Sequence, residues 1–272
     1  YRQNLDHNLQ ALEQRLRGGG WRPQPAREVL IPKPQGGMRP LAIGCLEDKI
    51  VQTLVVRILE AIYEPTFHRH SYGFRRGKSA HQALGRAYET ICRRKKSCVV
   101  VKMDIEKFFD SVDHDWLLRI LGQRIGDPHF LRLLARMLRC STLHADGAMA
   151  DKLSGTPQGS PASPILANVC LHVLLDQWFQ EHWSQQGEFI RYADDAVFVF
   201  SDEETARAFQ LSLIARMAEA GLSLNLEKTR IVPFSAAAPK GTITLLGFEL
   251  YWGTKRGLGK QLKVKTIPKR LA

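Results

Sequence analysis

The N-terminal part of the chain alternates between helical and strand patterns of apolar residues. Residues 1–18 carry leucines at every third or fourth position, which predicts an amphipathic helix that ends at three consecutive glycines. Residues 28–33 and 39–43 are rich in β-branched and aliphatic residues, with a pair of glycines between them. These two segments therefore predict a β-hairpin.

A second helix and a basic loop are expected next. Glu47 begins an amphipathic pattern that ends near Pro65, and acidic residues at its start suit the positive end of a helix. Residues 67–78 form a basic stretch punctuated by glycines. Ser79 is well placed to cap a helix that runs to about residue 96.

The clearest strand of the chain covers residues 98–105. Its pattern puts Asp104 at the end of an apolar strand, a good position for a site residue, although an isolated acid there would more often simply end the strand. Helices are predicted over residues 116–124 and 128–139, followed by a short hairpin around residues 146–147.

The remaining pattern predicts a loop, two helices and further strands. Residues 155–164 are rich in glycine, proline and serine and predict a loop that allows close approach of backbone to a substrate. Helices are expected over residues 163–183 and 203–220, and strands over residues 230–234 and 242–252.

Two adjacent carboxylates interrupt the apolar run of residues 190–200. Neighbouring residues on a strand point to opposite faces, so Asp194 and Asp195 serve one site only if the chain bends there, as in two strands joined by a tight turn. Carboxylate oxygens side by side favour Mg²⁺, which keeps substrate phosphates in its shell. An Asp-Asp pair taken alone is more often a polar hairpin tip.

The net charge points to a polyanionic partner. The 272 residues include 39 Lys and Arg against 27 Asp and Glu, which gives a charge of +12 and a pI near 9.7. The positive residues cluster at 75–78, 93–96 and 255–270. Each cluster alone would be an ordinary solvated surface, whereas three clusters with an acidic pair indicate a basic channel around a metal site.

Composition otherwise indicates an ordinary globular protein of the cytoplasm. Apolar content is 44%, no apolar run reaches the length of a membrane span, and no secretory pattern opens the chain. The chain starts without Met, so we expect a piece of a longer protein. Five cysteines without a C-x-x-C pair predict reduced thiols, and the pair of His68 and His70 is expected at the surface and not on zinc.

Seven ordered blocks together resemble the reverse transcriptases of the group II intron-like class. The resemblance covers nearly the whole chain, and a lone Tyr-x-Asp-Asp would be far weaker evidence. Residues 42–45 and 159–164 depart from the usual pattern of intron-encoded members. The second departure resembles host-recruited branches, including those tied to CRISPR spacer acquisition. The blocks are residues 31–41, 71–84, 104–110, 156–168, 192–195, 221–229 and 246–248.

The resemblance implies an α+β fold with the fingers and palm of a right-hand polymerase. The palm would consist of antiparallel strands in a split βαβ (ferredoxin-like) arrangement with helices on one face. Fingers are expected over residues 1–96 and palm over residues 97–272, with fingers elements interleaved at about 115–155. The thumb would be missing or only begun.

The resemblance also implies the site residues. Asp104, Asp194 and Asp195 would be catalytic, and with Ile105 would hold the metal. Template and primer would lie against Arg75, Arg76, Lys78, Gly247 and Phe248. Residues that would bind the nucleotide are Lys33, Arg39, Phe109, Gln158 and Lys228, with Phe109 excluding a ribose 2′-hydroxyl and Lys228 donating a proton to pyrophosphate or holding a phosphate.

The implied activity is RNA-directed DNA polymerisation with two Mg²⁺ ions, for which Mn²⁺ can substitute. Partners would be an RNA template, a DNA or RNA primer and deoxynucleoside triphosphates, together with intron RNA or CRISPR adaptation integrase proteins. Three alternatives stay open: the same chemistry in host defence or spacer acquisition, a non-catalytic RNA-binding maturase domain, and a polymerase of ribonucleotides, which Phe109 disfavours.

Overall fold

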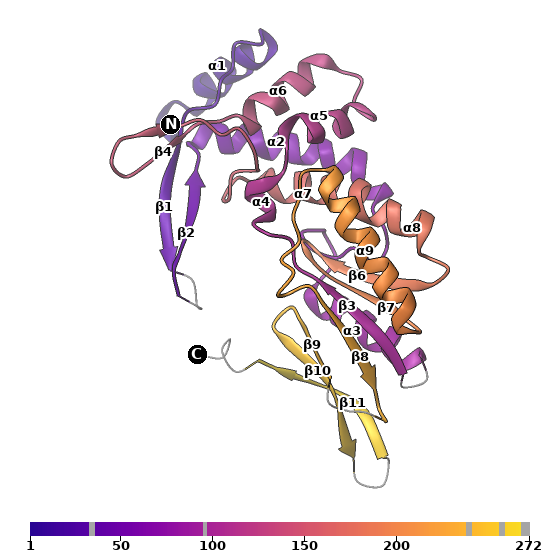
Figure 1. Ribbon diagram of the computed structural model, residues 1–272. Helices are drawn as coiled ribbons and strands as arrows, with labels where there is room; N and C mark the ends of the chain where they lie inside the picture. The colour runs from indigo at the N-terminus through magenta and orange to yellow at the C-terminus, as the bar shows by residue number, and fades with distance from the viewer. Residues whose placement is uncertain (33–35, 95–96, 238–240, 256–258, 268–272) are drawn as a thin grey trace. The chain divides into compact units, whose positions relative to one another are not determined.

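A computed structural model describes the chain except residues 33–35, 95–96, 238–240, 256–258 and 268–272 (Figure 1). The chain forms two compact units, each assembled from two stretches of sequence. Unit 1 comprises residues 1–62 and 112–166, and unit 2 comprises residues 63–111 and 167–272. The assignment of fingers to 1–96 and palm to 97–272 stays a prediction.

Unit 1 is built from helices and one small sheet. The sheet has the order β2-β1-β4-β5, in which β1 pairs antiparallel with β2 and parallel with β4. The predicted hairpin is thus confirmed, while Lys33 lies outside the described residues. The elements are η1 (Arg2–Asn4), α1 (Leu5–Arg17), β1 (Ala26–Pro32), β2 (Met38–Ile43), α2 (Leu46–Tyr63), α5 (His114–Gly122), α6 (Pro128–Leu138), β4 (Thr142–Leu143), β5 (Met149–Ala150) and the start of α7 (Ser163–Leu171).

Unit 2 contains two antiparallel sheets and the helices that pack on them. Ser79 caps α3 as predicted, in a capping box with Gln82. The elements after α2 and α7 are η2 (Glu64–Thr66), α3 (Ala80–Arg93), β3 (Ser97–Met103), α4 (Phe108–Ser111), η3 (His172–Gln177), α8 (Trp178–His182), β6 (Gly187–Tyr192), β7 (Asp195–Phe200), α9 (Glu203–Glu219), β8 (Arg230–Ser235), β9 (Thr242–Leu245), β10 (Phe248–Lys255) and β11 (Gly259–Thr266).

The larger sheet of unit 2 has the order β6-β7-β3-β8, with every neighbouring pair antiparallel. Along the chain these strands and their connecting helices run β3, α7–α8, β6, β7, α9, β8. This is the split βαβ arrangement that the sequence predicted. β3 and β7 lie in the middle because their apolar runs suit a strand that is buried on both faces.

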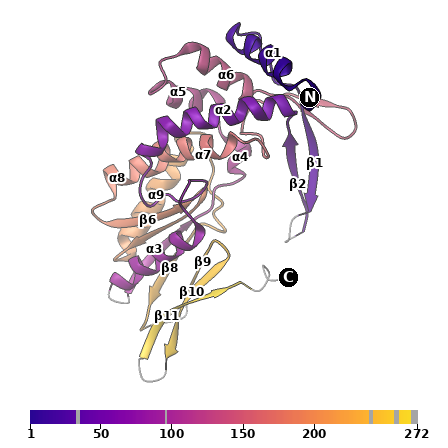
Figure 2. The same cartoon turned by 180° about the vertical axis from the view of Figure 1, so that it is seen from behind.

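The two crossover helices cover one face of this sheet. On that face, Phe209 of α9 packs against Phe198 and Phe200 of β7, and Phe179 of α8 packs beside them. The alternate residues Val197 and Val199 point the other way, into a core shared with α3 and the three-stranded sheet β11-β10-β9. Figure 2 shows α3 and this second sheet from behind.

Two features of unit 2 differ from the expected pattern. The helix predicted over residues 163–183 is interrupted by a π-helical segment, η3. β11 was not predicted; its alternating polar and apolar residues pair with β10 along eight residues. Among the helices of the described residues, none is both long and apolar enough to cross a membrane.

Candidate active site

The two adjacent aspartates lie at the tight turn that the sequence predicted. Tyr192 of β6 and Asp195 of β7 form the last pair of the antiparallel ladder, so Ala193 and Asp194 make a two-residue turn. Ala193 has a φ of 57°, in the left-handed region of the backbone that residues other than glycine rarely adopt. The bend lets neighbouring carboxylates belong to one site.

The third aspartate reaches the same end of the sheet from the central strand. Met103 of β3 pairs with Ala196 of β7. Because the two strands are antiparallel, Asp104 follows Met103 at the end where Asp195 precedes Ala196. The sheet therefore brings together the three carboxylates that the sequence singled out.

The loop before β8 fixes the backbone of Asp104. The Asn225 N–H donates to the Asp104 carbonyl at 2.9 Å, and the Asp104 N–H donates to Thr229 Oγ1 at 3.2 Å. Ile105, placed with the metal ligands, forms an isolated bridge with Leu224. These contacts hold the carboxylate of Asp104 at the strand end without using its oxygens.

Lys228, predicted to bind the nucleotide, lies beside this carboxylate. Its Nζ is 3.8 Å from Asp104 Oδ2, and its side chain is 64% exposed. A cation at this distance lowers the repulsion among the carboxylates and remains accessible to a phosphate.

Burial raises the pKa of Asp195, and the negative charges of Asp194 and Asp104 raise it further. Lys102 and a hydrogen bond from the Leu246 N–H to Asp195 Oδ2, 3.3 Å long, act in the opposite direction. A carboxylate under this repulsion gains stability from a nearby cation.

The carboxylates fit a divalent ion that is completed by substrate. No three His, Cys, Asp or Glu side chains converge as a ready-made metal cage in the part of the chain that the structure describes. Mg²⁺ does not need such a cage, since it is commonly held by one or two carboxylates and by phosphate oxygens. Asp104, Asp194 and Asp195 are each partly exposed, and Asp195 also accepts the hydrogen bond of the Leu246 N–H.

The turn of Ala193 and Asp194, here called the aspartate turn, packs directly against Gly73. A Cβ on Gly73 would lie 2.3 Å from the Ala193 nitrogen, so only glycine fits there. Asn168 Nδ2 donates to the Gly73 carbonyl at 2.8 Å, and Arg191 Nη1 donates to the Ala193 carbonyl at 2.9 Å. The main chain of the turn is thus held on both sides.

Arg191 anchors this support through a buried ion pair. Its Nε and Nη2 donate to the two carboxylate oxygens of Asp176 at 2.7 and 2.6 Å, and both side chains are fully buried. Arg191 lowers the pKa of Asp176 against the effect of burial. Neither residue was predicted from the sequence, although an arginine immediately before Tyr192 inside an apolar strand is itself an unusual signal.

Phe109, the predicted sugar gate, follows Asp104 on α4. Its half-buried ring meets Phe74 edge to face at a centroid distance of 6.4 Å, and Phe74 lies 6.5 Å from the Tyr192 ring. An aromatic wall therefore runs from α4 to the end of β6.

The other predicted nucleotide contacts belong to unit 1. The Ala42 N–H donates to the Gln158 carbonyl at 2.7 Å, so the loop of Gln158 lies against β2 of the hairpin. Gly159 has a φ of 104° and would bring a Cβ to 3.1 Å from the Ala42 carbonyl. Arg39 is exposed on the same strand, opposite Ile31.

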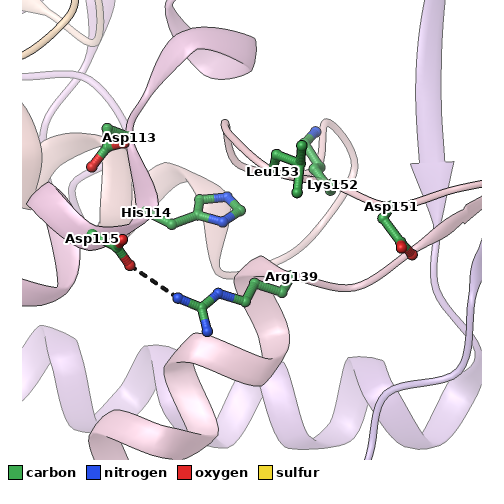
Figure 3. A pocket seen from close by; sticks show the side chains of 7 residues that line it. All are labelled: Asp113, His114, Asp115, Arg139, Asp151, Lys152 and Leu153. Carbon is green, nitrogen blue, oxygen red and sulfur yellow. Dashed lines mark hydrogen bonds and ion pairs between the residues drawn. The ribbon is translucent and has the colours of Figure 1, made fainter.

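His114 fixes the start of this loop. Its Nε2 donates to the Gly155 carbonyl at 2.7 Å, while its buried Nδ1 has no hydrogen-bond partner among the described residues. Figure 3 shows the ring in a pocket beside the ion pair of Asp115 and Arg139. His114 was not predicted from the sequence, because its contact with Gly155 joins residues 41 positions apart.

The predicted template contacts differ in what their side chains already bind. Arg75 is 7% exposed at its side chain, pairs with Glu64 at 2.8 Å and donates to the carbonyls of His68 and Ser71. These bonds leave little of its guanidinium for a phosphate. Arg76 is exposed and Lys78 is half-buried, with its Nζ 5.5 Å from the centre of the Tyr72 ring.

The predicted primer contacts lie in the turn between β9 and β10. Gly247 has a φ of 82°, and Phe248 begins β10 and meets His81 edge to face with a centroid distance of 5.8 Å. The preceding residue, Leu246, donates its N–H to Asp195, which ties this turn to the carboxylates. His68 and His70 were expected at the surface, but His70 is buried and His68 half-buried, and both pack on Phe189. Burial lowers the pKa of His70 to about 3.

A ferredoxin-like sheet thus carries three carboxylates at one end, one after the central strand and two at a hairpin turn. Residues 31–250 match the family described as reverse transcriptase (RNA-dependent DNA polymerase). The chain belongs to this reverse transcriptase family, in its group II intron-like class.

Two relatives support the assignment, and one solved structure shares the fold. Protein YkfC of Escherichia coli K12 is 30% identical over 97% of this chain and 76% of its own length. Group II intron-encoded protein LtrA of Lactococcus lactis is 37% identical over 62% of this chain. Apo telomerase from Candida tropicalis has the same fold, with a TM-score of 0.67 and 15% identity over 90% of this chain and 48% of that one. The chain spans 28% of the length of LtrA. It spans 18% of the length of another relative, the uncharacterized 91 kDa protein in the cob intron of Schizosaccharomyces pombe.

Proposed function

We propose that this chain is the fingers–palm part of an RNA-directed DNA polymerase that extends a primer with deoxynucleoside triphosphates. The observation that carries the proposal is the convergence of Asp104, Asp194 and Asp195 at one end of the sheet. A purely RNA-binding maturase domain would not require three mutually repelling carboxylates there.

In the proposed reaction, the primer 3′-oxygen forms a bond to the α-phosphorus and the bond to the β-phosphate oxygen breaks. Pyrophosphate leaves with the electron pair, and the hydroxyl proton passes to solvent. Two Mg²⁺ ions, or Mn²⁺ in their place, would activate the hydroxyl and neutralise the leaving group. Asp104 and Asp194 would hold these ions, with Asp195 alongside and Ile105 contributing its backbone carbonyl.

The remaining residues would position the substrates. Arg39 and Lys33 would bind triphosphate oxygens, and Gln158 would contact the incoming nucleotide. Lys228 would hold a phosphate or donate a proton to pyrophosphate. The template would be RNA. The similar protein LtrA is a group II intron-encoded protein, which supports intron RNA as the natural partner. A host-defence role would use the same chemistry on another RNA.

Primer extension by the full-length protein tests the proposal. Reactions would contain Mg²⁺ and a DNA primer on an RNA template, with deoxynucleotides or ribonucleotides. We expect Asp104→Ala and Asp194→Ala each to abolish extension while primer–template binding persists. Asp6→Ala, an exposed acid of α1, is the matched control and should extend normally. Extension by either of the first two variants would refute the assignment.

A further inference from the structure

Four arginines of unit 1 line a groove beside α6, and one of them, Arg139, pairs with Asp115 at 2.9 Å. Arg132 and Arg136 lie one turn apart on this helix, and Arg22 lies in the segment between α1 and β1. We call the groove lined by Arg22, Arg132 and Arg136 the arginine groove; its volume is about 440 Å³. None of the three forms an ion pair with a carboxylate of the described residues.

The geometry of the groove is fixed by main-chain carbonyls. Arg22 Nη1 and Arg136 Nη1 both donate to the carbonyls of Gly19 and Trp21, at 2.8–3.2 Å. Two guanidinium groups are thus held at the same pair of acceptors. Partial desolvation lowers the pKa of Arg136, and the charges of Arg22 and Arg132 lower it further. Like charges fixed together favour a bound anion, and the carboxylate of Asp115 pairs with Arg139 and with none of these three arginines.

An apolar pocket adjoins the groove and shares Arg132 and Arg136 with it. Its volume is also about 440 Å³, within the range of small-molecule sites. Leu54 is half exposed in this pocket although it is aliphatic. We call this the apolar pocket; its other apolar lining residues include Leu16, Ile58, Phe130 and Leu133. Asp127 also lines it, and its carboxylate accepts a hydrogen bond from the His129 N–H at 2.8 Å.

We propose that the arginine groove and the apolar pocket together bind an unpaired stretch of RNA. Phosphates of the strand contact the three guanidinium groups, and one unstacked base enters the apolar pocket. A duplex keeps its bases stacked and would leave the pocket unused, whereas single strands present bases to apolar and guanidinium surfaces. The choice of RNA over DNA rests on the proposed function, and the experiment separates the two.

Binding of three labelled probes to the full-length protein tests the proposal: a uridine-rich single-stranded RNA, the same sequence as DNA, and a blunt RNA hairpin. Arg132 bonds only His129 among the described residues, so Arg132→Gln should fold normally. We expect it to weaken binding of the single-stranded RNA several-fold. The slope of log affinity against log salt should fall by about 0.7, the value for one phosphate contact on a single strand.

A second variant tests the base site. Leu54→Asp should weaken binding of the single-stranded RNA and leave the blunt hairpin unaffected. Arg207→Gln and Leu211→Asp, at exposed positions of α9, are the matched controls and should bind every probe normally. Arg132→Lys should restore part of the lost affinity because it retains the charge.

Several results would overturn the inference. Unchanged affinity and slope in both Arg132→Gln and Leu54→Asp would do so, as would equal losses in the controls. If the variants weakened binding of the DNA probe as much as that of the single-stranded RNA, the groove would bind both nucleic acids, and the inferred selectivity for RNA would be overturned. Extension of a short primer–template is measured in parallel, since its absence in the unmodified protein would refute the polymerase and leave the groove's binding result intact.

Discussion

Gly73 leaves no space for a side chain beneath the aspartate turn. In Gly73→Ala the new Cβ would meet the backbone of Ala193 at 2.3 Å, so the turn and Asp194 must move. A displacement of about 1 Å at reacting groups can cost about 100-fold in rate, and we expect a loss of that order in primer extension. Gly85→Ala on α3, where a Cβ meets nothing within 4 Å, should keep full activity; loss there too would contradict the explanation.

Asp195 should lower the stability of the folded state while it supports primer extension. Its raised pKa means that the folded state favours the protonated form, so its contribution to stability falls as pH rises from the ordinary carboxyl pKa through the raised value. Asp195→Asn removes this cost. Without divalent ions at pH 7, we expect a melting temperature higher by about 2–4 °C, as about 1 kcal/mol would give.

The gain from Asp195→Asn should shrink as the pH is lowered past the ordinary carboxyl pKa, because both proteins are then neutral at this position. Thermal melts at a series of pH values measure it. A variant less stable than the unmodified protein at pH 7 would show that the hydrogen bond from Leu246 outweighs the repulsion. Extension activity should fall in the same variant.

Phe109 should set the preference for deoxynucleotides. Its ring is held by Phe74, so a ribose 2′-hydroxyl would meet a fixed wall. We expect Phe109→Ala to shift the ratio of kcat/KM for deoxynucleotides over ribonucleotides by about 10- to 100-fold toward ribonucleotides. Phe109→Tyr keeps the ring and should keep the preference. An unchanged ratio in Phe109→Ala would argue against a gate at this residue.

At this scale the sequence could predict the acidic residues but not their supports. Asp104, Asp194 and Asp195 are visible because carboxylates interrupt apolar strands. Asp176 and Gly73 act through contacts with residues distant in sequence, which no periodicity encodes. Their roles follow only once the strands and helices are placed.

The pair of Arg191 and Asp176 joins two elements, β6 and the π-helical segment η3. Removing one partner leaves a buried unpaired charge, and such changes cost about 3–5 kcal/mol. We therefore expect Arg191→Met or Asp176→Leu alone to be strongly destabilised, and the double variant to recover much of the stability. Chemical denaturation measures all three.

Activity distinguishes a positioning role of Arg191 from a purely structural one. The double variant still lacks the hydrogen bond from Arg191 to the Ala193 carbonyl. We expect it to fold but to extend primers with a lower kcat, and to require more Mg²⁺ for half-maximal rate. Normal kcat and Mg²⁺ dependence in a stable double variant would show that the pair of Arg191 and Asp176 only stabilises the fold.

Elements with a clear period were predicted from sequence, and those shaped by tertiary contacts were not. α3, β3 and α9 have caps or apolar runs that decide their type locally. η3 departs from α-helical spacing where Asp176 is buried against Arg191, a long-range contact. β11 has a polar composition and is a strand because β10 offers it an edge.

Over the whole molecule, the chain passes between the two units three times, at residues 62–63, 111–112 and 166–167. A stretch rich in glycine, serine and proline, residues 155–164, precedes the third crossing, whereas no such stretch marks the second. The three carboxylates predicted to be catalytic belong to unit 2, while Arg39 and Gln158 belong to unit 1. The second stretch of unit 1, residues 112–166, lies close to the interleaved segment predicted at about 115–155.

The net charge of +12 should govern binding of nucleic acid more than the chemical step. Lysines and arginines that contact phosphates release counterions, so affinity for primer–template should fall by about 10³–10⁵-fold between 50 and 200 mM salt if 6–10 phosphates are contacted. At saturating primer–template, kcat should change little, because the carboxylates act at short range where salt screens weakly. Steady-state extension at several salt concentrations separates the two effects. A salt-dependent fall in kcat at saturation would mean that the charged residues also assist the reacting phosphates.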